Sequence, residues 1–125
     1  MRNTIRFTTN WNNKLLNKAF TTIRIHNPNK YIVGSVYNIE LNGKPQGKAI
    51  LRIIKTLRLS QLNDFICFID TGYNKEHTTQ ILSRMYPGVN LNEVLFDFCL
   101  LVNQPRKPEI HKHPKQGVLK LPYKD

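Results

Sequence analysis

The sequence predicts an α+β fold, built as a small mixed β-barrel of about five strands with two or three helices. Several short segments alternate apolar and polar residues with the period of a half-buried strand. Two later segments carry apolar residues at helical spacing. Asn42-Gly43, between two strand-like runs, is typical of a β-hairpin turn. With 125 residues, 40% of them hydrophobic, the chain can bury one modest core.

The first element is a strand over residues 4–9, where Ile5 and Phe7 alternate with polar residues. Residues 11–16 follow as a short helix, for which Asn10 is a suitable N-cap.

The second strand covers residues 21–26 and places three polar side chains, Thr22, Arg24 and His26, on one face. Its two isoleucines lie on the opposite face, which we expect to be the core face. An arginine between two polar groups on a half-buried sheet is suited to bind an anion or a base edge, and a solvated strand face is the structural alternative.

The third and fourth strands, residues 35–41 and 46–56, flank the Asn42-Gly43 turn. A helix then begins at Ser60, with an apolar stripe of Leu62, Phe65, Ile66 and Ile69. A second helix begins at Asn74, with a stripe of Thr78, Ile81, Leu82 and Met85. Pro87-Gly88 ends this helix, and a closing strand covers residues 94–102.

The composition changes at Asn103. We therefore expect a barrel domain over residues 1–102 and a flexible, Pro-rich basic tail over residues 103–125. The tail has six basic side chains against Glu109 and Asp125, a formal charge of +4. A basic arm of this kind is suited to follow a phosphate backbone, while a solvated tail without a function is the alternative.

The charge of the chain favours a polyanionic partner. Lys and Arg number 19 against 8 Asp and Glu, a formal charge of +11. No segment is apolar enough or long enough to span a bilayer, and the N-terminus has no apolar run typical of a secretion signal. We expect a cytoplasmic protein whose partner is nucleic acid.

Cysteine and histidine usage gives no sign of a metal site or a cofactor. Cys67 and Cys99 stand in apolar contexts without zinc-ligand spacing, so we expect buried structural thiols. His111 and His113 lack further ligands nearby. We therefore predict no metal and no cofactor.

RNA is preferred over duplex DNA because neither predicted helix has the basic face of a recognition helix. Basic side chains on the strands and in the tail would contact phosphates, and an exposed tyrosine would stack on an unpaired base. The residues expected to contact nucleic acid are Thr22, Arg24, His26, Lys44, Lys48, Arg52, Arg2, Arg6, Tyr73, Arg106 and Lys107.

Several landmarks, in this order, resemble the ASCH domain, a member of the PUA-like barrels. They are the helix-into-strand segment ending Thr21-Thr22-Ile23-Arg24, the run 31–36 (Tyr-Ile-Val-Gly-Ser-Val), a helical insertion and the stop Met85-Tyr86-Pro87-Gly88. The resemblance covers residues 3 to 102. It places Asn17 at the family's Gly, Ala19 at its Lys, Thr22 at its acidic or Thr position and Arg24 at its Arg.

The resemblance implies RNA binding, because PUA-like domains bind RNA. It also implies an alternative, since some ASCH proteins are amidohydrolases that act on acetylated cytidine and are thought to use the Lys, the Thr and a later Glu. Ala19 cannot replace that Lys, which leaves Lys18, Thr22 and Asp70 as candidate catalytic residues. A third alternative is a small basic protein that binds and modulates another protein.

Overall fold

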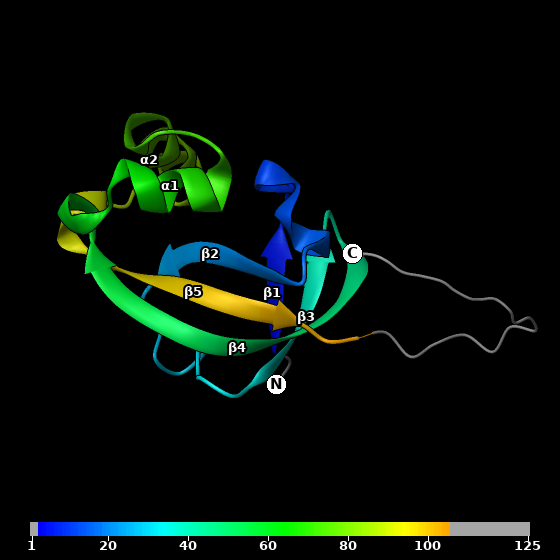
Figure 1. The fold of residues 1–125 in the computed structure, drawn as a ribbon. Coiled ribbons are helices and arrows are strands. Elements are labelled where there is room, and N and C mark those ends of the chain that lie inside the picture. Colours follow the sequence, from blue (N-terminus) through cyan, green and yellow to red (C-terminus); the bar gives the residue numbers. More distant parts are fainter. Residues whose placement is uncertain (1–2, 106–125) are drawn as a thin grey trace, which may run out of the picture.

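The computed structural model describes residues 3–105 (Figure 1). The positions predicted at Arg2, Arg106 and Lys107, and the tail from residue 106 onward, lie outside these residues. The elements in chain order are β1 (Thr4–Phe7), the 3₁₀-helix η1 (Trp11–Leu16), β2 (Ala19–Ile25), β3 (Val36–Leu41), β4 (Lys44–Arg58), the 3₁₀-helix η2 (Leu59–Gln61), α1 (Asp64–Thr71), α2 (Lys75–Met85), the 3₁₀-helix η3 (Leu91–Glu93) and β5 (Leu95–Asn103).

The five strands form one curled mixed sheet in the order β1-β3-β4-β5-β2, which confirms a small α+β, barrel-like fold. Only β1 and β3 pair in parallel. The two edge strands, β1 and β2, approach each other as the sheet curls (Figure 1). Nη2 of Arg24 on β2 donates to the main-chain oxygen of Arg6 on β1 at 2.9 Å, so a side chain bridges the two edges.

The predicted hairpin is confirmed. Leu41 pairs with Lys44 across the turn, and the two turn residues have φ angles of 53° (Asn42) and 79° (Gly43). Two consecutive left-handed residues match the twist of the flanking strands, and asparagine and glycine adopt that conformation at least cost.

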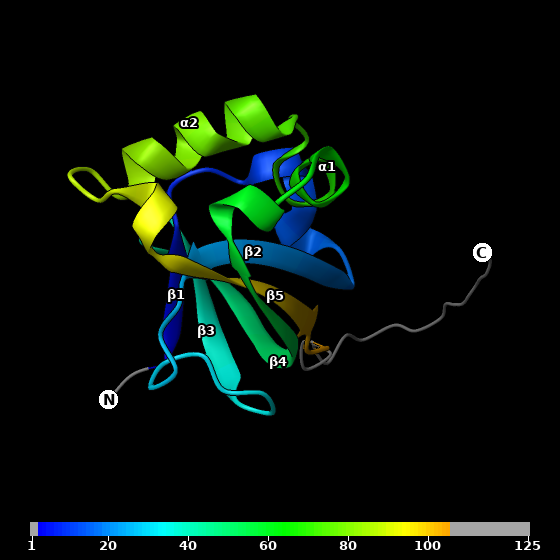
Figure 2. The same cartoon turned by 90° about the vertical axis from the view of Figure 1, so that its left-hand side faces the viewer.

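Both faces of β2 are buried, which corrects the expectation of a single core face on this strand. The inner face holds the cluster that contains Phe20 and Leu101. The opposite face holds Ile23 and Phe96, which pack against the helices. Figure 2 shows α2 lying across this end of the sheet above β2. The face of β2 with Thr22 therefore points into the barrel, and Thr22 itself is buried.

The buried face of α1 differs from the predicted apolar stripe. The helix begins at Asp64 after an Asn63 N-cap, and it buries Cys67, Asp70 and Thr71. Phe65 is 72% exposed. The stripe was wrong because long-range contacts turn the other face of α1 inward: Asp70 is buried against Lys14, and Thr71 is buried against Thr78. For α2 the cap and three of the four stripe residues are confirmed: Asn74 caps the helix, and Thr78, Ile81 and Leu82 are buried, whereas Met85 is exposed.

Residues 11–16 form a 3₁₀-helix with a kink, where we had predicted a regular short helix. Asn12 and Asn13 have positive φ angles of 60° and 51°. The kink turns Lys14 and Leu15 into the molecule and leaves Leu16 exposed.

Both cysteines are buried and free, as predicted. Burial, with a smaller contribution from Asp97, raises the pKa of Cys99 to about 12, so its thiol stays protonated at neutral pH. Among the described helices, none is both long and apolar enough to cross a membrane.

Candidate functional site

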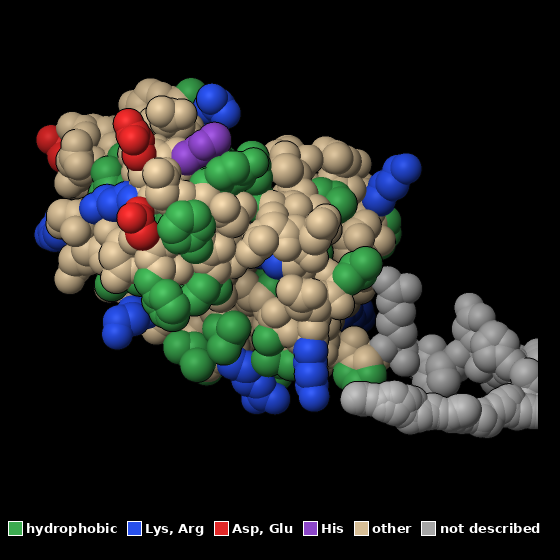
Figure 3. All heavy atoms as spheres, turned by 45° about the horizontal axis from the view of Figure 1, so that its top comes forward, with side chains coloured by type: hydrophobic (Ala, Val, Ile, Leu, Met, Phe, Trp, Pro, Cys, Tyr) green, Lys and Arg blue, Asp and Glu red, His purple; other side chains and the backbone are tan. Residues whose placement is uncertain are grey.

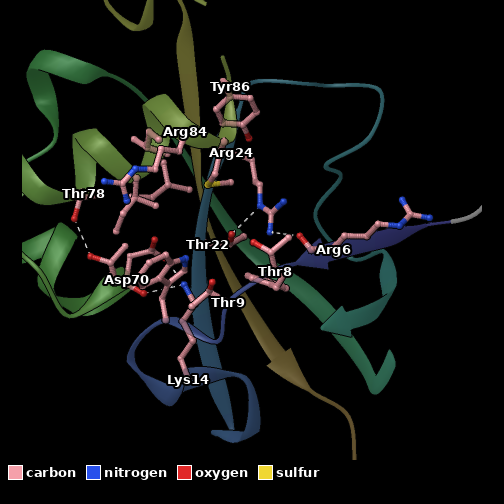
Figure 4. A pocket seen from close by; sticks show the side chains of 17 residues that line it. Arg6, Thr8, Thr9, Lys14, Thr22, Arg24, Asp70, Thr78, Arg84 and Tyr86 are labelled. Atoms are coloured by element: carbon pink, nitrogen blue, oxygen red, sulfur yellow. Dashed lines mark hydrogen bonds and ion pairs between the residues drawn. The ribbon is translucent and has the colours of Figure 1, made fainter. Parts of the chain in front are cut away.

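A pocket of about 570 Å³ opens between β1, the free edge of β2, η1 and the two α-helices. Figure 4 shows side chains from these elements converging on it. The size lies within the range of pockets that take small ligands. Three of its walls carry an arginine, Arg6 from β1, Arg24 from β2 and Arg84 from the end of α2.

Arg24 is the most constrained of these cations. Its Nε donates to Thr22 Oγ1 at 2.9 Å, its Nη2 donates to the Arg6 carbonyl at 2.9 Å, and its guanidinium lies 4.6 Å from the centre of the Phe7 ring. A guanidinium has five N–H donors, so three remain without a partner among residues 3–105. None of the carboxylates in that range forms an ion pair with Arg24.

A fixed guanidinium without a counter-ion binds an anion well because its geometry is already set before the ligand arrives. The neighbouring Arg6 differs, since it is exposed and its Nε pairs with Glu40 at 3.3 Å. Of these two arginines, Arg24 is therefore the one that is held in place without a carboxylate partner among residues 3–105.

The floor of the pocket contains a buried ion pair. Nζ of Lys14 lies 2.8 Å from Oδ1 of Asp70 and also donates to the main-chain oxygen of Asp70. Thr21 donates to the same Oδ1 at 2.8 Å. Burial lowers the pKa of Lys14, and Asp70 opposes that change. An amine whose pKa is lowered in this way is a candidate proton acceptor.

An aromatic cluster adjoins the pocket. Trp11 lines both the pocket and a second hollow of about 420 Å³, which Tyr73 also lines. The Trp11 and Tyr73 rings meet edge to face at 6.0 Å, and Tyr73 stacks on His77 at 4.1 Å. A half-buried tryptophan and an exposed tyrosine beside a basic pocket are suited to stack on bases.

The pocket brings together Arg6, Thr22, Arg24 and Asp70 from the sequence-predicted site residues. Tyr73 lies in the adjoining hollow. Other predicted residues, exposed and outside the pocket lining, are Lys18, His26, Lys44, Lys48 and Arg52. Arg52 also stands at a register shift of β4, between Leu51 and Ile53, and therefore faces no residue of β5.

His26, the residue after the end of β2, was predicted to share a face with Arg24 but has another partner. Its Nδ1 lies 2.9 Å from Oδ1 of the buried Asp97. Thr56 donates to the same oxygen, and the main chain of Asn27 donates to the other. Asp97 of β5 therefore ties β4 to the start of the loop after β2.

Sequence reasoning missed Lys14, Trp11 and Arg84. Lys14 is buried only because the two left-handed asparagines turn the chain, and no periodicity signals that turn. Arg84 was not among the predicted contact residues, yet α2 brings it to the pocket. No group of three or more potential metal ligands occurs within residues 3–105.

Comparison with known proteins found no matching family model, no matching curated protein and no matching solved structure.

Proposed function

We propose that the chain binds single-stranded or structured RNA and holds one nucleotide in the pocket beside Arg24. The observation that carries this proposal is Arg24, a fixed guanidinium with three unpartnered donors and no carboxylate partner among the described residues. A nucleotide supplies the phosphate that such a group binds.

The surroundings of Arg24 support the same ligand. The pocket is large enough for a nucleotide, and Trp11 and Tyr73 offer rings on which a neighbouring base could stack. The resemblance of the sequence to the ASCH domain also supports RNA binding. The excess of positive charge would attract the rest of the strand.

The test compares Arg24→Ala with Arg52→Ala, which removes the same side chain from an exposed position outside the pocket. Trp11 is the one tryptophan of the chain and lines the pocket, so its fluorescence reports binding directly. We expect Arg24→Ala to weaken binding of a short RNA by about 1–3 kcal/mol and Arg52→Ala to have a much smaller effect. Equal losses in the two variants would contradict the pocket as the binding site.

A second candidate function, hydrolysis of an acylated nucleoside such as acetylated cytidine, is favoured by the ion pair on the pocket floor. Lys14, Asp70 and Thr22 come from three different elements and line one pocket. Lys14 would thus provide the amine that Ala19 lacks. A lowered pKa leaves more of this amine neutral and able to accept a proton.

Turnover is measured as acetate released from acetylated cytidine. If the chain is a hydrolase, Lys14→Met should lower the rate at least a hundredfold, and Lys18→Met, at an exposed lysine outside the pocket, should leave it unchanged. The rate of the unmodified chain should rise with pH as Lys14 loses its proton. Absence of turnover in the unmodified chain would leave RNA binding as the function.

A further inference from the structure

The edge strand β2 turns part of its main chain toward the pocket. Among the strands within residues 3–105, β5 is its only partner in the sheet. The bonds from His26 N to the Leu95 oxygen and from Asn103 N to the Lys18 oxygen fix which residues of β2 bond to β5. Because bonded and non-bonded pairs alternate in an antiparallel ladder, Thr21, Ile23 and Ile25 direct their N–H and C=O groups to the free edge.

These three residues differ in whether their main-chain groups have a hydrogen-bond partner and whether they line the pocket. The Ile25 N–H donates to the Tyr86 hydroxyl at 3.2 Å. Thr21 does not line the pocket. Ile23 does, it is only 2% exposed, and its N–H and C=O have no partner among residues 3–105. Buried main-chain groups almost always have a partner, so an unpaired pair facing a pocket points to a ligand.

We propose that the N–H and C=O of Ile23 bind the Watson–Crick edge of a nucleobase held in this pocket. The inference rests on the proposed RNA-binding function and names how the base is recognised. In an antiparallel ladder, the N–H and C=O of one residue bond together to a partner that offers an acceptor beside a donor. A nucleobase offers such a pair along its Watson–Crick edge.

The position of Arg24 fits this arrangement. Arg24 follows Ile23 on the strand, so its side chain projects from the face of β2 opposite to that of the Ile23 side chain. Both residues nevertheless line the same pocket. The base would lie against the strand edge, between β2 and α2, and the phosphate would meet the guanidinium.

A peptide strand added to the edge of β2 is the competing occupant. Such a strand needs several successive open pairs along the edge, but Tyr86 takes the N–H of Ile25, and the open pair of Thr21 lies outside the pocket. A single flat group fits this edge better than a strand.

The first experiment tests the base edge. Four RNA hexamers of uridine, guanosine, cytidine or adenosine are titrated against Trp11 fluorescence. Each is compared with an analogue altered at the ring nitrogen of its Watson–Crick edge: 3-methyluridine, 1-methylguanosine, 3-deazacytidine or 1-deazaadenosine. For the base whose hexamer binds most tightly, we expect the hexamer of its analogue to bind at least tenfold more weakly. Equal binding would overturn the inference, whereas failure of all the hexamers and of longer RNA to bind would overturn the proposed function itself.

The second experiment removes the donor alone. Replacing Ile23 by the corresponding α-hydroxy acid turns its main-chain N–H into an ester oxygen and keeps the side chain. The same change at Thr21, on the same edge but outside the pocket, is the matched control. We expect at least a fivefold loss of hexamer affinity for the change at Ile23 and none at Thr21, with unchanged circular dichroism in both. Equal hexamer affinities of the Ile23 ester and the Thr21 ester would reject the main-chain contact. So would a competing peptide strand that displaces the hexamer equally well from the two esters.

Discussion

Lys14 is a buried cation, and Asp70 is its carboxylate partner. The two side chains are 5% and 7% exposed, so neither charge is well hydrated. An ion pair buried to this degree adds little net stability, but removing one partner leaves an uncompensated charge. We therefore expect the pair to affect the free energy of unfolding mainly when one of its two partners is removed.

Asp70→Asn should lower the free energy of unfolding by about 3 kcal/mol at neutral pH, since it leaves Lys14 buried without a carboxylate. Adding Lys14→Met in that background should restore much of the loss. The deficit should shrink as pH rises toward the lowered pKa of Lys14 in the unmodified chain, because without Asp70 the folded chain releases the Lys14 proton at a lower pH and so begins to gain stability earlier. Urea denaturation of the single and double variants measures both effects. A double variant no more stable than Asp70→Asn would show that Lys14 is not the uncompensated charge.

At the scale of elements, predictability follows how local the determining contacts are. The hairpin was predictable because asparagine and glycine at the turn decide its conformation by themselves. The helix α2 was predictable because its cap, Asn74, and its buried stripe agree. The helix α1 was not, because Phe65 and Ile69 are exposed while Asp70 is buried against Lys14 from a distant part of the chain.

The pocket was only partly predictable for the same reason. Thr22 and Arg24 share a face by simple strand alternation, so their proximity could be read from the sequence. The approach of Lys14 depends on left-handed backbone at Asn12 and Asn13, and the open edge at Ile23 depends on which strand pairs with β2. Neither fact has a local signal in the sequence.

At the scale of the whole molecule, charge and apolar surface are distributed unevenly. Figure 3, with the helical layer turned forward, shows hydrophobic side chains gathered in a band and basic side chains mostly along its margins. Exposed apolar residues of this layer include Leu16, Phe65, Phe68 and Ile69. Three of the six carboxylates within residues 3–105, Glu40, Asp70 and Asp97, each contact a basic group of the fold. Because Lys and Arg outnumber Asp and Glu by 19 to 8, a positive surplus remains that would attract a polyanion over a wide surface.

This surplus predicts how RNA binding responds to salt. Each phosphate contacted on a single strand contributes about −0.7 to the slope of log affinity against log salt. A chain ending at Pro105 lacks the six basic residues that follow and should give a shallower slope than the full chain. Arg24→Ala should reduce the slope in both lengths by the same amount, because its pocket and the tail would contact different phosphates. Equal slopes for the two lengths would mean that the basic residues after Pro105 contact no phosphate, and the recognition would then belong entirely to the barrel.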